Sequence, residues 1–162
     1  MITIFDWVSR IITIIFAVSG LFNWLKSIFP VLARLGMGLS KRKIAIFASA
    51  NNYSSLKDLL VDSKLFNTRN IIQISTISDL GKSEKSNLFL VFWPDWKDNL
   101  NKILSKKNDS DALVVYAPQS KGSIPKLQMD DIDNQRNAIV TNFRGRLLND
   151  IVITMITTDY KK

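Results

Sequence analysis

Leu88-Phe-Leu-Val-Phe92 is the segment of the sequence on which the fold assignment depends. Five consecutive apolar side chains in so short a run are typical of a strand covered on both faces, as strands in a parallel sheet are. Other short apolar runs lie on both sides of it along the chain, and polar segments separate them. The predicted strands are residues 44–48, 70–75, 88–92, 112–116 and 138–141.

Helices are predicted between these strands. One is expected from about Ser55, where Ser55 and Asp58 fit a capping box, and others over residues 96–105 and 125–135. The last, over residues 143–158, is apolar nearly all round, which predicts that a neighbour buries it. Strands that alternate with helices predict an α/β fold with a doubly wound, mostly parallel five-stranded sheet. The expected strand order is the flavodoxin-like 2-1-3-4-5.

The first 25 residues form a separate, mostly apolar segment, long enough as a helix to cross a hydrocarbon core of about 30 Å. A secretory signal peptide would begin with a positive region, whereas this segment begins with Asp6. An interfacial amphipathic helix would carry many basic residues, and only Arg10 and Lys26 are present. We therefore favour a membrane-inserted helix, in which Trp7 and Trp24 suit the two interfaces.

Small and polar residues recur at spacings of three and four along this segment, so a helix would carry them on one stripe. Helices in lipid associate through small and polar surfaces, because lipid tails are as apolar as leucine. Asp6 and Arg10 are four residues apart with the acid first, an order that favours pairing and lowers the cost of insertion. The stripe consists of Thr3, Asp6, Arg10, Thr13, Ala17, Gly20 and Asn23.

Basic residues follow the apolar segment, among them Lys26 and the run 41–43. The positive-inside rule then predicts a single-pass protein of the inner (cytoplasmic) membrane with its main domain in the cytoplasm. Residues 26–40 include a proline and are expected either as a kinked continuation of the helix or as a short surface helix. The predicted division is 1–40, membrane-inserted helix plus juxtamembrane segment, and 41–162, cytoplasmic α/β domain.

The composition restricts the chemistry that the chain can perform. Its formal net charge of +8 suits an anionic membrane surface, a phosphorylated ligand or a nucleic acid. No arginine- and lysine-rich arm with interleaved aromatics is present, so a nucleic acid polymer is not an expected partner. The chain has no cysteine, no histidine and a single glutamate, Glu84. We therefore predict no catalytic set, no metal site and no cofactor.

Loops at the carboxyl ends of the predicted strands hold the candidate binding residues. The loop 49–55 is rich in hydroxyls and amides and leads into a helix, which favours a bound phosphate or carboxylate, although a capped turn is the alternative. Trp93 can stack on a base or pack in the core. Arg144 and Arg146 lie at a predicted helix start, where the helix dipole disfavours a positive charge unless it faces an anion or a partner's carboxylate. The alternative is a solvated pair with Asp150. The candidates are Ser49, Asn51, Asn52, Ser54, Trp93, Asp95, Lys121, Arg144 and Arg146.

The element pattern of residues 43–158 resembles the small Rossmann-like and TIR-like modules of prokaryotic immune, or anti-phage, effectors. Some of those modules are fused to an N-terminal membrane segment and respond to cyclic oligonucleotides or other nucleotide signals. TIR enzymes that cleave NAD carry a glutamate on the helix after the third strand. The corresponding stretch 96–104 has Asp98 instead, which places NAD cleavage in doubt.

Three functions follow as hypotheses. The first is an oligomeric membrane effector whose α/β domain senses a nucleotide-like signal or a partner protein, and whose N-terminal helices assemble to perturb or perforate the membrane. The second is a membrane-tethered, TIR-like nucleotide hydrolase that uses Asp95 or Asp98. The third is a non-catalytic membrane scaffold in which Arg144 and Arg146 bind a partner protein. The absence of a catalytic set favours the first.

Overall fold

The computed structural model describes residues 4–158, with side chains described for residues 6–30, 36 and 38–158. The chain divides into two units, Met1–Met37 and Gly38–Lys162. Helix α1 (Ile4–Lys41) forms the first unit and continues into the second, passing through Pro30 without a break in the helix. Residues 26–40 are therefore a continuation of the apolar helix and not a separate surface helix.

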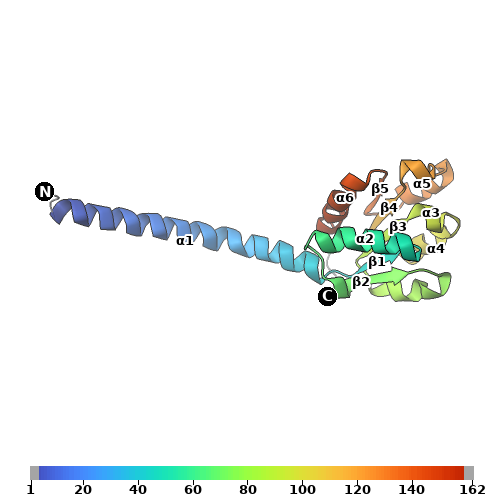
Figure 1. Cartoon of the computed structure of the whole chain (residues 1–162), viewed down its shortest axis with the longest axis horizontal. Coiled ribbons are helices and arrows are strands. Elements are labelled where there is room, and N and C mark those ends of the chain that lie inside the picture. The colour runs from blue at the N-terminus through green and yellow to red at the C-terminus, as the bar shows by residue number, and fades with distance from the viewer. Residues whose placement is uncertain (1–3, 159–162) are drawn as a thin grey trace. The chain divides into compact units, whose positions relative to one another are not determined.

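The second unit is built on a five-stranded parallel sheet (Figure 1). The observed strand order β2-β1-β3-β4-β5 confirms the predicted one. Each strand agrees with its predicted range to within one residue, because short, mostly apolar runs between polar segments favour buried strands. The strands are β1 (Ile44–Phe47), β2 (Ile71–Ile74), β3 (Leu88–Phe92), β4 (Ala112–Tyr116) and β5 (Ala138–Thr141).

Helices cover both faces of the sheet, as in a doubly wound fold (Figure 1). Successive side chains of β1 point to opposite faces, so Ile44 and Ile46 join one core cluster while Ala45 and Phe47 join the other. The first face is covered by α2 (Ala50–Asp62) and α6 (Arg144–Ile156). The second face is covered by η2 (Ile77–Lys85), α3 (Trp93–Trp96), α4 (Leu100–Leu104) and α5 (Lys126–Asp133). Short 3₁₀ turns complete the domain, namely η1 (Thr68–Asn70), η3 (Lys97–Asn99) and η4 (Gln119–Lys121).

The start of α2 differs from the prediction. The helix begins at Ala50, with Ser49 as its N-cap residue in extended conformation. The predicted capping box of Ser55 and Asp58 is therefore wrong, since both residues lie inside the helix. The helix starts earlier because a carboxylate on another loop fixes the backbone at Ser49, a contact between residues 46 positions apart.

Helix α6 has one buried face. Leu147, Ile151 and Met155 are buried against the sheet, but Ile153 and Ile156 are 51% and 53% exposed. The sheet therefore buries one face of the helix, as the prediction of a neighbour requires, and the outer face remains exposed. The helix packs on β4 and β5, and an outer position on a surface helix stays in contact with solvent even when its side chain is apolar.

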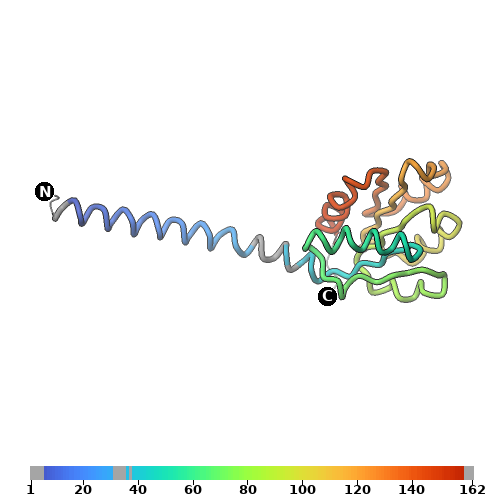
Figure 2. Tube along the Cα trace, viewed as in Figure 1, coloured from blue at the N-terminus to red at the C-terminus, as the bar shows by residue number. Residues whose placement is uncertain are grey.

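The last turn of α1 belongs to the second unit and is fixed at the amino edge of the sheet, where the chain enters β1 (Figure 2). Leu39 is buried in the first core cluster, and the Asn70 side-chain amide donates to the Ser40 carbonyl at 2.8 Å. The Arg42 guanidinium is 7% exposed and donates to the Thr158 hydroxyl at 2.6 Å and to the Thr158 carbonyl at 2.7 Å. The carboxyl edge, with the candidate loops, is the opposite edge of the same sheet.

Candidate functional site

The segments that follow β1 and β3 meet at the switch point of the sheet, where Asp95 of α3 is hydrogen-bonded to the start of α2. One oxygen of its carboxylate accepts the Ser49 backbone N–H at 2.7 Å, and the Asn52 amide donates to both carboxylate oxygens at 2.9 and 3.1 Å. The Asn52 amide also donates to the Ser49 hydroxyl at 3.1 Å. Three of the predicted site residues are thus brought together, and the anion at the start of α2 is a side chain of the protein itself.

The electrostatics of Asp95 fit this structural role. Burial alone would raise the pKa of its carboxyl group. The hydrogen bonds from Asn52 and Ser49, together with the nearby charge of Lys121, outweigh burial and hold the pKa below its usual value. Asp95 is therefore ionised at neutral pH and acts as a hydrogen-bond acceptor between two loops. A general acid would need the opposite shift.

Within residues 4–158, the remaining candidates near this point form no hydrogen bond with Asp95, and Lys121 acts on it through its charge alone. Asn51 and Ser54 are exposed on the first turns of α2, and Lys121 is exposed in η4. Asp98 is exposed in η3, away from the hydrogen bonds that hold Asp95. A bound anion at the β1 loop stays a prediction, and the Asp95 carboxylate already receives the Ser49 N–H and the Asn52 amide on which that prediction relied.

Trp93 lies in the core, as the packing interpretation predicted. Its side chain is 6% exposed, and its ring nitrogen donates to the Gln128 side-chain oxygen at 2.8 Å. Gln128 in turn donates to the Lys97 carbonyl at 2.7 Å, which ties α5 to the segment after β3. Trp96 packs edge-on against Phe47 in the same cluster. Stacking of an exposed base on Trp93 therefore has no open ring face to use.

A cavity of about 470 Å³ lies at the carboxyl ends of β4 and β5, beside α5. Ala117, Ile124 and Met129 give it apolar walls, and the polar side chains that line it are Gln119, Ser123 and Asn142. All of these side chains are uncharged. The cavity has the size and the mixture of apolar walls with few polar groups that small-molecule sites share.

Gly122 shapes the rim of this cavity. Its φ of +107° lies in a region that side-chain-bearing residues rarely adopt. A β-carbon added there would lie 3.9 Å from the Trp93 ring, an ordinary contact. The backbone conformation, and not lack of space, therefore calls for glycine at this turn.

The two arginines at the start of α6 serve different purposes. Arg144 donates from its guanidinium to the Ser55 carbonyl at 2.8 Å, which joins α6 to α2. Arg146 is exposed and lines a second cavity, of about 150 Å³, together with Asn142 and Asp150. Among residues 4–158, no ion pair joins either arginine to Asp150, so the predicted solvated pair is not formed.

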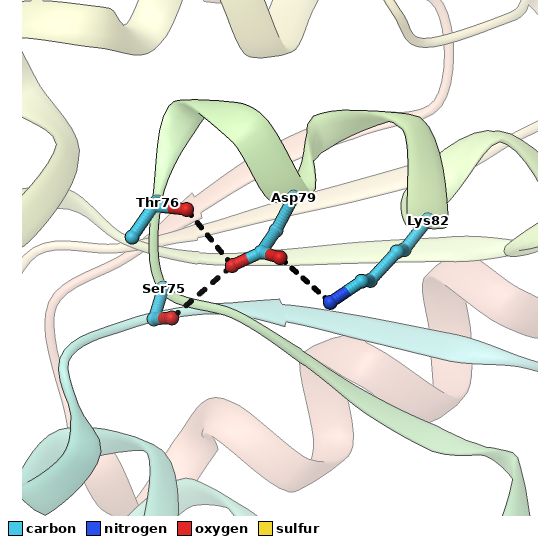
Figure 3. A network of polar contacts seen from close by, with 4 residues as sticks. All are labelled: Ser75, Thr76, Asp79 and Lys82. Carbon is cyan, nitrogen blue, oxygen red and sulfur yellow. Dashed lines mark hydrogen bonds and ion pairs between the residues drawn. The ribbon is translucent and has the colours of Figure 1, made fainter.

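A further polar network, which the sequence prediction missed, follows β2 (Figure 3). The Asp79 carboxylate accepts from the hydroxyls of Ser75 at 3.3 Å and Thr76 at 2.9 Å, and it pairs with the Lys82 ammonium at 2.6 Å. The hydrogen bonds from Lys82 and Thr76 lower the pKa of Asp79 to about 2. The i,i+3 spacing of Asp79 and Lys82 was the available signal.

No protein-family model, curated protein or solved structure matches this chain. The resemblance to TIR-like modules therefore stays a prediction, and function has to be argued from geometry. Two observations are available for that purpose. The first is a carboxyl edge that Asp95 bridges at β1 and β3 and that holds cavities at β4 and β5, and the second is an exposed apolar helix.

Proposed function

We propose that the protein is a single-span membrane effector that assembles through its N-terminal helix under the control of a ligand-binding α/β domain. The domain lies on the cytoplasmic side of the inner membrane, because the basic residues that follow the apolar segment favour that side. Of this flank, Lys26, Lys41 and Lys43 are exposed and available to anionic lipid. Arg42 is buried and contributes its charge inside the domain.

The observation that carries this proposal is the exposed apolar surface of α1. The segment Asp6–Pro30 has 25 residues, its most apolar 18-residue window has a mean hydropathy of 1.7, and it is long and apolar enough to cross a membrane. None of its most apolar window is buried by the rest of the chain, and Phe16 is 74% exposed. Apolar surface on this scale marks contact with lipid or with another protein surface.

The stripe supports assembly of the helices. The Thr13 hydroxyl donates to the Ser9 carbonyl at 2.9 Å, so this polar group is satisfied within its own helix. A β-carbon added at Gly20 would meet no atom within 4 Å, so a second helix can approach closely there. Asp6, Arg10, Ala17 and Asn23 continue the stripe, whereas Thr3 lies outside the described residues.

Membrane insertion is tested with the full chain, tagged at its N-terminus, expressed in bacteria. We expect the protein to resist alkaline carbonate extraction and to keep its tag, and we expect protease added to spheroplasts to leave the α/β domain intact. Loss of the tag would identify a cleaved signal sequence, and release by carbonate would identify a peripheral protein. Either result would contradict the proposal.

Assembly is tested with two matched substitutions on opposite sides of the helix. Gly20→Leu places a leucine side chain on the stripe, and Val18→Leu places the same side chain on the opposite side of the helix. We expect the wild type and Val18→Leu to form a defined oligomer in detergent and to release dye from liposomes, and Gly20→Leu to do neither while still inserting. A wild-type protein that is monomeric in detergent would rule out the assembly.

A further inference from the structure

We propose that the two cavities that share Asn142 form one site for a 5′-mononucleotide, with the base in the larger cavity and the phosphate at Arg146. This inference rests on the proposed function in taking the carboxyl edge as the sensing surface. It goes further by naming the position of the site, the class of ligand and the residue that reads each part of it.

The larger cavity fits an uncharged heteroaromatic ring. Its walls include Met129 and Ile124, which offer the apolar surface that the faces of a base require. The side-chain amides of Gln119 and Asn142 each present two donors and one acceptor oxygen, the groups that pair with the edge of a base. A volume of about 470 Å³ lies within the usual range for small-molecule pockets, about 300–1,000 Å³.

The smaller cavity supplies the charge that the larger one lacks. Arg146 lines it and is exposed, with no ion pair among residues 4–158 to occupy its guanidinium. A guanidinium binds phosphate through two parallel hydrogen bonds. Asp150 lines the same cavity but is only 5% exposed, so the cation is the more accessible of the two charges. Asn142 lines both cavities and thus lies where the sugar would join base to phosphate.

The switch point is a poorer location for the same ligand. Parallel sheets usually bind nucleotides between the two strands where the order reverses, which here are β1 and β3. Asp95 already accepts the Ser49 N–H there, and its ionised carboxylate would repel a phosphate. Ligand binding at β4 and β5 leaves these contacts intact.

Binding is measured by calorimetry on the full chain in detergent. The probes are the 5′-monophosphates of adenosine, guanosine, cytidine and uridine, the four nucleosides, and ribose 5-phosphate. We expect at least one mononucleotide to bind, its nucleoside to bind about tenfold more weakly for want of the charged contact, and ribose 5-phosphate to bind more weakly still. Failure of all four mononucleotides to bind at millimolar concentration would overturn the proposal.

Three substitutions locate the site. Ser123→Phe fills the larger cavity from an exposed position and should abolish binding of nucleotide and nucleoside alike. Arg146→Gln should weaken the nucleotide about tenfold and leave the nucleoside unchanged. Arg69→Gln removes an exposed arginine elsewhere and is the matched control. If Ser123→Phe fails to fold by circular dichroism, Gln119→Ala replaces it, with a loss of at least threefold for both probes.

Two results would overturn the site even if a nucleotide binds. One is unchanged affinity when the larger cavity is filled, and the other is an equal loss for nucleotide and nucleoside in Arg146→Gln. These measurements are independent of membrane insertion and oligomer formation. A protein that inserts and assembles but binds no mononucleotide would refute the site alone, whereas one that binds but remains monomeric would refute the assembly.

Discussion

The two halves of the carboxyl edge of the sheet have opposite character. At the ends of β1 and β3, the Asp95 carboxylate draws two loops together through the Ser49 N–H and the Asn52 amide. At the ends of β4 and β5, two cavities remain open beside uncharged amides and one accessible arginine. Topology predicts a crevice at the first position. The hydrogen bonds of Asp95 span that position, and the two cavities lie at the second.

The difference shows that a switch point is a place where a ligand can bind and not evidence that one does. A carboxylate satisfies helix N–H groups as an external anion would. When the chain supplies that carboxylate itself, the position becomes a structural joint. The strand ends without such an internal partner are then the better place to look for a site, and three predictions, centred on Trp93, Asp95 and Asp79, test this comparison.

The largest effect is expected from Trp93, the first residue of α3, directly after β3. Trp93→Ala removes a buried ring from the second core cluster and should lower the free energy of unfolding by about 3–5 kcal/mol. Urea denaturation followed by circular dichroism measures the loss. Trp93→Phe keeps much of the packing and loses the bond to Gln128, so it should cost about 1 kcal/mol. A cost below about 1 kcal/mol for Trp93→Ala would show that the ring is not part of the core.

An intermediate effect is expected from Asp95→Asn. The loss at pH 7 should be about 1 kcal/mol, since solvent screens part of the charged contacts. The folded pKa of Asp95 is lowered, so its stabilisation is present above the unfolded pKa and is lost as pH falls through the folded value. The difference between wild type and variant should therefore shrink from pH 7 toward pH 3.

The control for this substitution is Asp98→Asn, at an exposed position three residues along the chain. It should change the free energy of unfolding by less than about 0.5 kcal/mol at either pH. Equal effects of the two substitutions, measured by urea denaturation, would mean that Asp95 does not join the loops. The contrast between the ends of β1 and β3 and the ends of β4 and β5 would then not hold.

The smallest effect is expected from Asp79, which lies in η2 after β2. The pKa of Asp79 is lowered to about 2, so its contribution is present above the unfolded pKa and disappears as pH falls toward 2. In Asp79→Asn the thermal midpoint of unfolding should decrease less over this acid range than in the wild type, and it should change little at pH 7. Lys82→Gln should show the same smaller decrease, because Lys82 is the main cause of the shift. If the thermal midpoint of both variants decreased at acid pH as it does in the wild type, the network would be refuted.

The sheet could be read from the sequence because β1, β3 and β4 are buried apolar runs and β2 and β5 are mostly apolar ones. The start of α2 could not, because it depends on Asp95, which lies 46 positions away from Ser49. The polar spacing that favoured Ser55 and Asp58 as a cap is equally compatible with the interior of a helix. Local signals fail where a contact between distant loops decides the backbone.

The sequence predicted which loops hold the candidate residues but not what those residues contact. The loops after β1, β3, β4 and β5 were selected, yet Ser49, Asn52 and Asp95 bind one another, and Arg144 binds a backbone carbonyl. Gln119, Met129 and Asn142 were missed as individual residues, because amides and methionine are common on surfaces and only the fold brings them around one cavity. Their position near the ends of β4 and β5 was the one signal available.

The two hydrogen bonds between Arg42 and Thr158 can form only late in the synthesis of the protein. The two residues are separated by 116 positions, so the guanidinium gains these acceptors only after nearly the whole domain has left the ribosome. Helix α1 is synthesised first, and chains emerge at about 5–20 residues per second. The apolar segment therefore emerges several seconds before the α/β domain can close. The membrane insertion that we propose would thus precede folding of the domain.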